Sequence, residues 1–122
     1  MWRFALIAFL IAHGLVHIAV WAPRYDKEKM PFDSSHSWLL GDARALAIAL
    51  AVASAVLLVV AGLGLWAHAG WWRPATVIGL AASLTVIALY FNPWYLFITA
   101  VNLALIVPIA WLAWPTKSMV GA

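Results

Sequence analysis

Three stretches of the chain lack charged side chains and are long enough to cross a membrane. They cover residues 4–23, 45–72 and 74–116. A helix rises about 1.5 Å per residue and a hydrocarbon core is about 30 Å thick, so one crossing needs about 20 residues. The third stretch has roughly twice that length, and Asn92-Pro93 near its middle combines a favoured N-cap residue with a favoured first helical residue. The pattern therefore predicts four membrane-spanning helices.

We expect an all-α fold, a four-transmembrane-helix antiparallel bundle in which residues 1–122 form a single integral membrane domain. The expected helices cover about 2–22, 43–66, 74–91 and 93–114, and a polar loop, 23–42, joins the first two. Tryptophan is typical of the headgroup level of a membrane. The nine tryptophans all lie near expected helix ends: Trp2, Trp21, Trp38, Trp66, Trp71, Trp72, Trp94, Trp111 and Trp114.

Composition and charge agree with a membrane protein. Hydrophobic residues make up 67% of the chain and the mean hydropathy is +1.00. The net charge of +3 comes from few charged residues, so we expect the lipid bilayer and not a nucleic acid as the partner. The absence of cysteine excludes disulfides, thiolate metal sites and thiol nucleophiles.

The distribution of charge also bears on orientation. All four carboxylates lie in the polar loop, where they offset its basic residues, whereas Arg3, Arg73 and Lys117 belong to the side that carries both termini. Basic residues favour the cytoplasmic side. We therefore expect a multi-pass protein with cytoplasmic termini.

Small residues recur at four-residue spacing on two expected helices. Ala47, Ala51 and Ala55 form one such face, and Gly79 and Ser83 belong to another. Such faces allow helices to approach closely. They indicate packing within the bundle, or self-association as the alternative.

The candidate chemistry lies in the first span, at His13 and His17. Residues four apart share one face of a helix, and Gly14 beside them leaves room for another backbone or a flat ligand. Measured from Trp21 at the helical rise, His17 lies about 6 Å and His13 about 12 Å into the membrane. Ionisable groups at such depth are rare and are candidates for function.

The last span offers polar partners at the same depths. Measured from Trp94, Thr99 and Asn102 lie about 7 and 12 Å deep. This match pairs His17 with Thr99 and His13 with Asn102. We therefore expect the first and last helices to face each other through a polar pocket on the loop side, under a lid formed by residues 33–36.

The histidine pair admits several roles. In the structural one, the imidazoles bond to Asn102, threonines and backbone carbonyls and hold the bundle in register. In the ligand-binding one, His13, His17, Asn102, Thr99 and Gly14 line a ligand or cofactor pocket. A transition metal could use His13 and His17 with His36 as a third ligand, and haem or a chlorophyll-type pigment could use one imidazole; no cofactor is the default. No residues are assigned to catalysis.

Short motifs carry a resemblance to a known group of proteins. His13-Gly14-Leu15-Val16-His17, Ser37-Trp38-Leu39-Leu40-Gly41 and Phe91-Asn92-Pro93-Trp94, with Ala100-Val101-Asn102, resemble small uncharacterised four-helix bacterial membrane proteins and, more distantly, DoxX-like proteins. The resemblance implies the fold and a location in the bacterial cytoplasmic (inner) membrane, but no reaction.

Three classes of function remain open. The first is a small accessory subunit, or a hydrophobic-ligand or cofactor-binding protein, in contact with other membrane subunits or with itself. The second is an oligomeric transporter or channel, although no carboxylate or basic residue lies within the spans to couple ions. The third is a redox protein that ligates a metal or haem through histidine.

Overall fold

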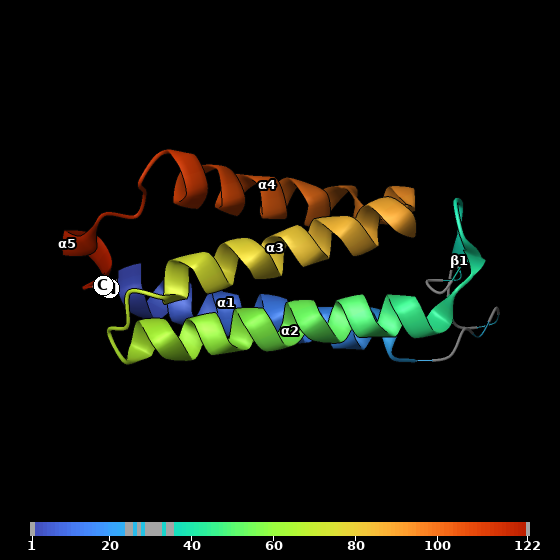
Figure 1. Cartoon of the computed structure of the whole chain (residues 1–122), viewed down its shortest axis with the longest axis horizontal. Helices are drawn as coiled ribbons and strands as arrows, with labels where there is room; N and C mark the ends of the chain where they lie inside the picture. The colour runs from blue at the N-terminus through green and yellow to red at the C-terminus, as the bar shows by residue number, and fades with distance from the viewer. Residues whose placement is uncertain (1, 24–25, 27, 29–32, 34–35, 122) are drawn as a thin grey trace.

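The computed structural model describes residues 2–23, 26, 28, 33 and 36–121 and has four long helices (Figure 1). α1 is Trp2–Trp21, α2 is Arg44–Trp66 and α3 is Trp72–Leu89; the last span begins with a 3-10 helix, η1 (Pro93–Tyr95), and continues as α4 (Leu96–Trp111). All four spans are long and apolar enough to cross a membrane. The predicted all-α bundle and its multi-pass character are confirmed.

The break between the third and fourth spans has the predicted local cause. The side-chain oxygen of Asn92 accepts a hydrogen bond from the backbone N–H of Trp94 at 3.0 Å. Pro93 takes the first helical position, where its missing N–H costs nothing. The last span is shorter than expected because α4 ends at Trp111 and the chain turns away before Trp114.

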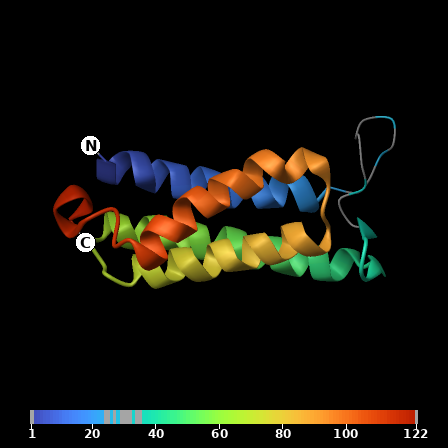
Figure 2. The ribbon, with the colours of Figure 1, turned by 90° about the horizontal axis from the view of Figure 1, so that it is seen from above.

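The two ends of the bundle differ in structure. Both termini lie at one end, and a small antiparallel hairpin lies at the other (Figures 1 and 2). The hairpin pairs β1 (His36–Ser37) with β2 (Gly41–Asp42). The Ser37 hydroxyl donates to the carbonyl of Leu89, and the Trp38 indole donates to the carbonyl of Ala88 at 2.6 Å. These bonds satisfy carbonyls that the end of α3 leaves free.

α1 and α2 make the most extensive contact between described helices, and glycines allow their close approach. A Cβ added at Gly14 would lie 3.0 Å from the carbonyl oxygen of Ala55. One added at Gly62 would lie 2.8 Å from the side chain of Ile11. The predicted packing role of the small face on α2 is confirmed, since Ala47, Ala51 and Ala55 are all buried.

The buried apolar residues form two separate clusters along the length of the bundle. One lies towards the termini: Ile7, Leu10, Leu58, Ala61, Leu65, Trp72, Leu80, Ile106, Ile109 and Val120. The other lies towards the hairpin: Trp21, Ala47, Ala51, Val86, Ile87, Tyr90 and Tyr95. On α1, α3 and α4, the residues between the two clusters include buried polar side chains. The two apolar clusters are therefore separated by a polar level.

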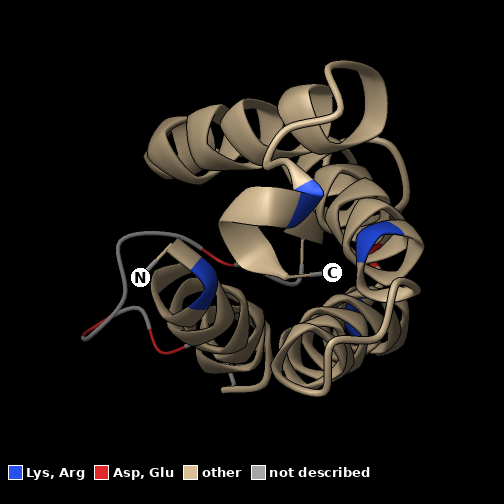
Figure 3. Ribbon diagram, turned by 90° about the vertical axis from the view of Figure 1, so that its left-hand side faces the viewer, with Lys and Arg blue, Asp and Glu red and all other residues tan. Residues whose placement is uncertain are grey.

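The C-terminal segment turns back into the bundle as a short helix, α5 (Lys117–Val120), which the sequence did not predict. Figure 3 shows it among the four spans when the bundle is seen from the end that carries the termini. Val120 is buried in the cluster towards the termini. The Arg73 guanidinium donates to the carbonyl of Pro115, and His68 Nδ1 donates to the carbonyl of Gly121 at 3.1 Å. The segment thus closes this end of the bundle.

Candidate functional site

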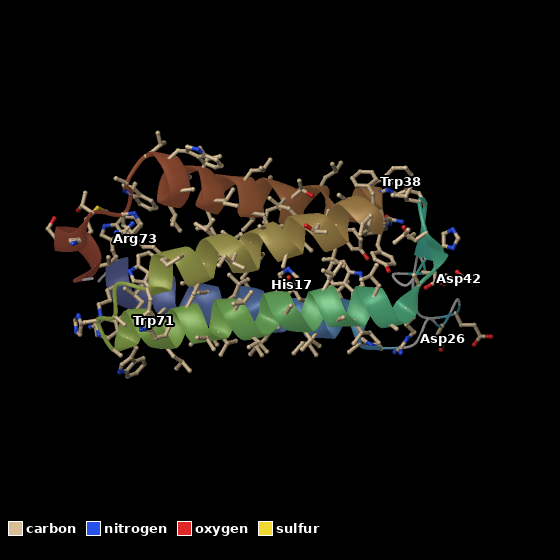
Figure 4. All side chains as sticks on the ribbon, in the orientation of Figure 1. His17, Asp26, Trp38, Asp42, Trp71 and Arg73 are labelled. Atoms are coloured by element: carbon tan, nitrogen blue, oxygen red, sulfur yellow. The ribbon has the colours of Figure 1, made fainter. Side chains whose placement is uncertain are left out.

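Four polar side chains from three helices meet between the two apolar clusters. His13 and His17 come from α1, Ser83 from α3 and Asn102 from α4. Their exposed fractions are 8%, 1%, 0% and 0%, respectively, so these groups cannot be satisfied by bulk water. Figure 4 places His17 near the middle of the bundle. We call this set the polar ring.

Hydrogen bonds link every member of the polar ring. His13 Nε2 lies 2.6 Å from Asn102 Oδ1, and Asn102 Nδ2 lies 2.7 Å from Ser83 Oγ. Ser83 Oγ lies 2.5 Å from His17 Nε2, and His17 Nδ1 lies 2.8 Å from the backbone oxygen of His13. The bonds therefore begin at the side chain of His13 and return to its backbone.

The direction of each bond follows from the chemistry of its atoms. A carbonyl oxygen can only accept a hydrogen bond, so His17 Nδ1 carries a proton. In a neutral imidazole the other nitrogen is an acceptor, so His17 Nε2 accepts a hydrogen bond from the Ser83 hydroxyl. The Ser83 oxygen is then the acceptor for the Asn102 amide N–H. Asn102 Oδ1 accepts from His13 Nε2–H. All of these hydrogen bonds are satisfied when both histidines are neutral, with the proton on Nε2 in His13 and on Nδ1 in His17.

Aromatic rings continue the same face of α1 beyond the polar ring. Phe9, His13, His17 and Trp21 follow one another at four-residue spacing, with ring centroids 5.4, 5.2 and 5.8 Å apart. Trp21 then contacts Tyr95 of η1, with centroids 5.2 Å apart. This stack fixes the imidazole planes, so the polar ring is held in one geometry.

The predicted pairing of polar residues at equal depth in the first and last spans is only partly correct. His13 contacts Asn102, as expected. Thr99, however, donates to the carbonyl of Tyr95 in its own span at 2.9 Å, and His17 bonds to Ser83 instead. Ser54, Thr76 and Thr85 likewise bond the carbonyl four residues earlier in their own helices. A hydroxyl that can find a backbone carbonyl locally does not need a second helix.

Two other candidate residues lie away from the polar ring. Gly14 faces α2, where its missing side chain admits the backbone at Ala55, so it leaves no room there for a flat ligand. His36 lies in the hairpin and pairs with Asp42 at 2.8 Å, and Figure 4 places Asp42 at the hairpin end, far from His17. Of the expected lid, Ser34 and Ser35 lie outside the described residues.

The histidine pair does not offer the free nitrogen from each imidazole that the expected metal site would use. Both Nε2 atoms are engaged with protein partners, and His17 Nδ1 is engaged with a carbonyl. Within the described part of the chain, no group of three or more histidine and acidic side chains could hold a metal ion. The expected set of His13, His17 and His36 is therefore not assembled.

An apolar cleft lies beside the polar ring, between α1 and α4, with a volume of about 390 Å³. Its lining comes from α1, α4 and the C-terminal segment: Trp2, Ala5, Leu6, Phe9, Val101, Ala104, Leu105, Trp114, Pro115 and Val120. Phe9 stacks on His13, so the inner end of the cleft adjoins the polar ring. The expected pocket was polar and on the loop side, whereas this cleft is apolar and lies towards the termini.

Sequence reasoning missed two parts of this site. Ser83 was assigned to a small packing face, although a hydroxyl in the middle of a span was itself a signal of a polar partner. The cleft depends on how α4 and the C-terminal segment sit against α1, and no local pattern encodes that placement.

Comparisons of the chain with models of protein families, with curated proteins and with solved structures found no match. The resemblance to small four-helix bacterial membrane proteins is therefore not confirmed, and it rests on the quoted motifs. What the fold supports is the coarser statement that this is a helical membrane protein.

Proposed function

We propose that this protein binds the apolar chain of a hydrophobic ligand within the membrane, in the cleft between α1 and α4. The observation that carries the proposal is the cleft itself. Its volume of about 390 Å³ lies within the range of small-molecule sites, roughly 300–1,000 Å³. Every lining residue is apolar or aromatic, which suits a hydrocarbon chain.

The polar ring supports this proposal by acting as a fixed inner wall. The bond from His13 to Asn102 ties α1 directly to α4 at one level. On the side towards the termini, the same helices contribute Phe9 and Leu105 to the cleft. In our proposal the ring sets the distance between the helices and the cleft receives the ligand, so the histidines position the site without touching the ligand's polar group.

The other candidate functions have less support. A transporter would need a polar path, but an apolar cluster lies on each side of the polar ring. A metal or haem protein would use imidazole nitrogens as ligands, and three of the four nitrogens of His13 and His17 bond to protein partners. An accessory role, with the bacterial inner membrane as its location and cytoplasmic termini, remains compatible with ligand binding and is part of our proposal.

The proposal is tested by filling the cleft. The protein would be purified in a mild detergent and its retained hydrophobic molecules extracted and quantified by mass spectrometry. Ala104 lines the cleft, so Ala104→Phe should lower retention roughly tenfold, which corresponds to a loss of about 1.4 kcal/mol of binding free energy, and Ala5→Phe on the facing helix should do the same. Leu63→Phe, on an exposed position of α2, is the matched control and should retain the wild-type amount. Wild-type retention in both cleft variants would contradict the proposal.

A further inference from the structure

We infer that the ligand is an anionic phospholipid, with one acyl chain in the cleft and its phosphate beside Arg3 and Lys117. This inference rests on the proposed ligand-binding function and adds the chemical class of the ligand. Three features of the site lead to it: the apolar lining, the level of the cleft in the membrane and the charge around its mouth.

The lining determines where the polar part of the ligand lies. Leu6, Phe9, Val101 and Leu105 line the cleft along α1 and α4, and none of them offers a hydrogen bond. A ligand with a buried polar head would lose its hydration there without compensation. The polar head must therefore remain at the mouth while the apolar chain enters.

The mouth of the cleft lies at the headgroup level. Trp2 and Trp114 meet there edge to face, with ring centroids 6.1 Å apart, and both side chains remain partly exposed. Indole rings favour this level of a membrane. Phe9, at the inner end, is about 10 Å further along α1 at the helical rise, which is less than the roughly 15 Å of one leaflet. A chain that enters from the adjoining headgroups can therefore fill the cleft without leaving its leaflet.

The charge at this end selects an anionic head. Arg3 follows Trp2, and Lys117 lies between the lining residues Pro115 and Val120. Figure 3 shows the basic segments of α1, α5 and α3 around the end that faces the viewer, and Figure 4 places Asp26 and Asp42 at the opposite end. Among the described side chains, those around this end therefore carry a net positive charge.

Arg3 is fixed at this end of the bundle. Its guanidinium donates to the carbonyls of Leu65 and Trp66, at 3.3 and 2.5 Å, where α2 ends. A guanidinium has further N–H groups that can bind a phosphate oxygen. The Arg3 side chain also adjoins α5, since a Cβ at Gly121 would lie 4.0 Å from Arg3 Cδ. Lys117, which is exposed, completes the basic mouth.

The test offers the protein two lipids with the same acyl chains and headgroups of different net charge. Purified protein would be exchanged into micelles with equal amounts of palmitoyl-oleoyl phosphatidylglycerol and phosphatidylcholine, repurified, and its retained lipid quantified. We expect enrichment of phosphatidylglycerol by roughly fivefold for each engaged cation, the scale of one basic side chain at an anionic surface. Lys117→Gln should lower the enrichment about fivefold, and the Arg3→Gln, Lys117→Gln double variant should abolish it. Arg44→Gln, at the hairpin end, is the matched control and should leave the enrichment unchanged.

The outcomes separate this inference from the proposed function. Equal retention of the two lipids by the wild type, or enrichment that persists in the double variant, would overturn the anionic class while leaving ligand binding intact. Retention of a hydrophobic molecule that is not a phospholipid would do the same. Wild-type retention of lipid by both Ala104→Phe and Ala5→Phe would instead overturn the site in the cleft.

Discussion

The most informative single substitution is Asn102→Leu, which removes the amide from the polar ring while keeping the same number and branching of side-chain heavy atoms. Asn102 is fully buried and joins His13 to Ser83. Ser83 would keep its bond to His17, so it would lose one of two partners. The main cost falls on His13 Nε2–H, which would be left without an acceptor in an apolar environment.

The magnitude follows from that unsatisfied donor. Hydrogen bonds between membrane helices average about 0.6 kcal/mol and reach about 1.7 kcal/mol. Leaving a buried donor unpaired costs about 1–3 kcal/mol. The second figure applies here because His13 is 8% exposed and stacked under Phe9, with little room to turn towards another acceptor. We therefore expect Asn102→Leu to lower the free energy of unfolding by about 2 kcal/mol.

The assay is reversible unfolding in mixed micelles with increasing dodecyl sulfate, followed by tryptophan fluorescence. Thr99→Val is the matched control on the same helix, since its hydroxyl bonds only within its own span, and it should change the stability by less than about 0.6 kcal/mol. In a double-mutant cycle, His13→Leu with Asn102→Leu should be less destabilising than the sum of the single changes, because both partners are then apolar. Wild-type stability of Asn102→Leu would show that the bond between His13 and Asn102 does not stabilise the bundle.

Three further predictions concern other parts of the structure. Gly14→Ala should destabilise the bundle by about 1–3 kcal/mol, as overpacking does, because the new Cβ would lie 3.0 Å from a backbone oxygen of α2. Gly70→Ala is the control, since its new Cβ would enter open space, and it should be neutral. Unfolding of both variants in the same micelles measures the difference. Arg73→Gln should speed amide hydrogen exchange in α5, because it weakens the bond to the Pro115 carbonyl, while exchange in α2 should not change. Nitrogen chemical shifts of the imidazoles should show a proton on Nδ1 in His17 and on Nε2 in the other histidine of the polar ring, and the same tautomer in both would contradict the assigned bond directions.

The hydrophobic pattern predicted the spans because a membrane constrains sequence strongly. A charge-free segment of sufficient length must form a helix, since hydrocarbon offers no partners for the backbone. Asn92 and Pro93 then fixed the last boundary through chemistry that acts within a few residues. The C-terminal helix was missed because it depends on distant partners, the Arg73 guanidinium and the His68 imidazole.

The polar ring was predictable only in part for the same reason. Depth alone paired His13 with Asn102, because α1 and α4 both cross the apolar layer and carry these residues at the same level. Depth did not distinguish Thr99 from Ser83 as the partner of His17, since that choice depends on helix rotation and on which hydroxyl finds a carbonyl locally. The cleft arises from the placement of three segments and has no signature within any one of them.

α1 and α4 are joined at the polar ring, and we propose that the cleft beside it holds an apolar chain. A density map of the protein in lipid nanodiscs that contain phosphatidylglycerol tests it most directly. We predict continuous chain-like density from between Trp2 and Trp114 to Phe9, together with the contact between His13 and Asn102. A map in which the side chains of α1 and α4 close the cleft, with no such density, would contradict the claim.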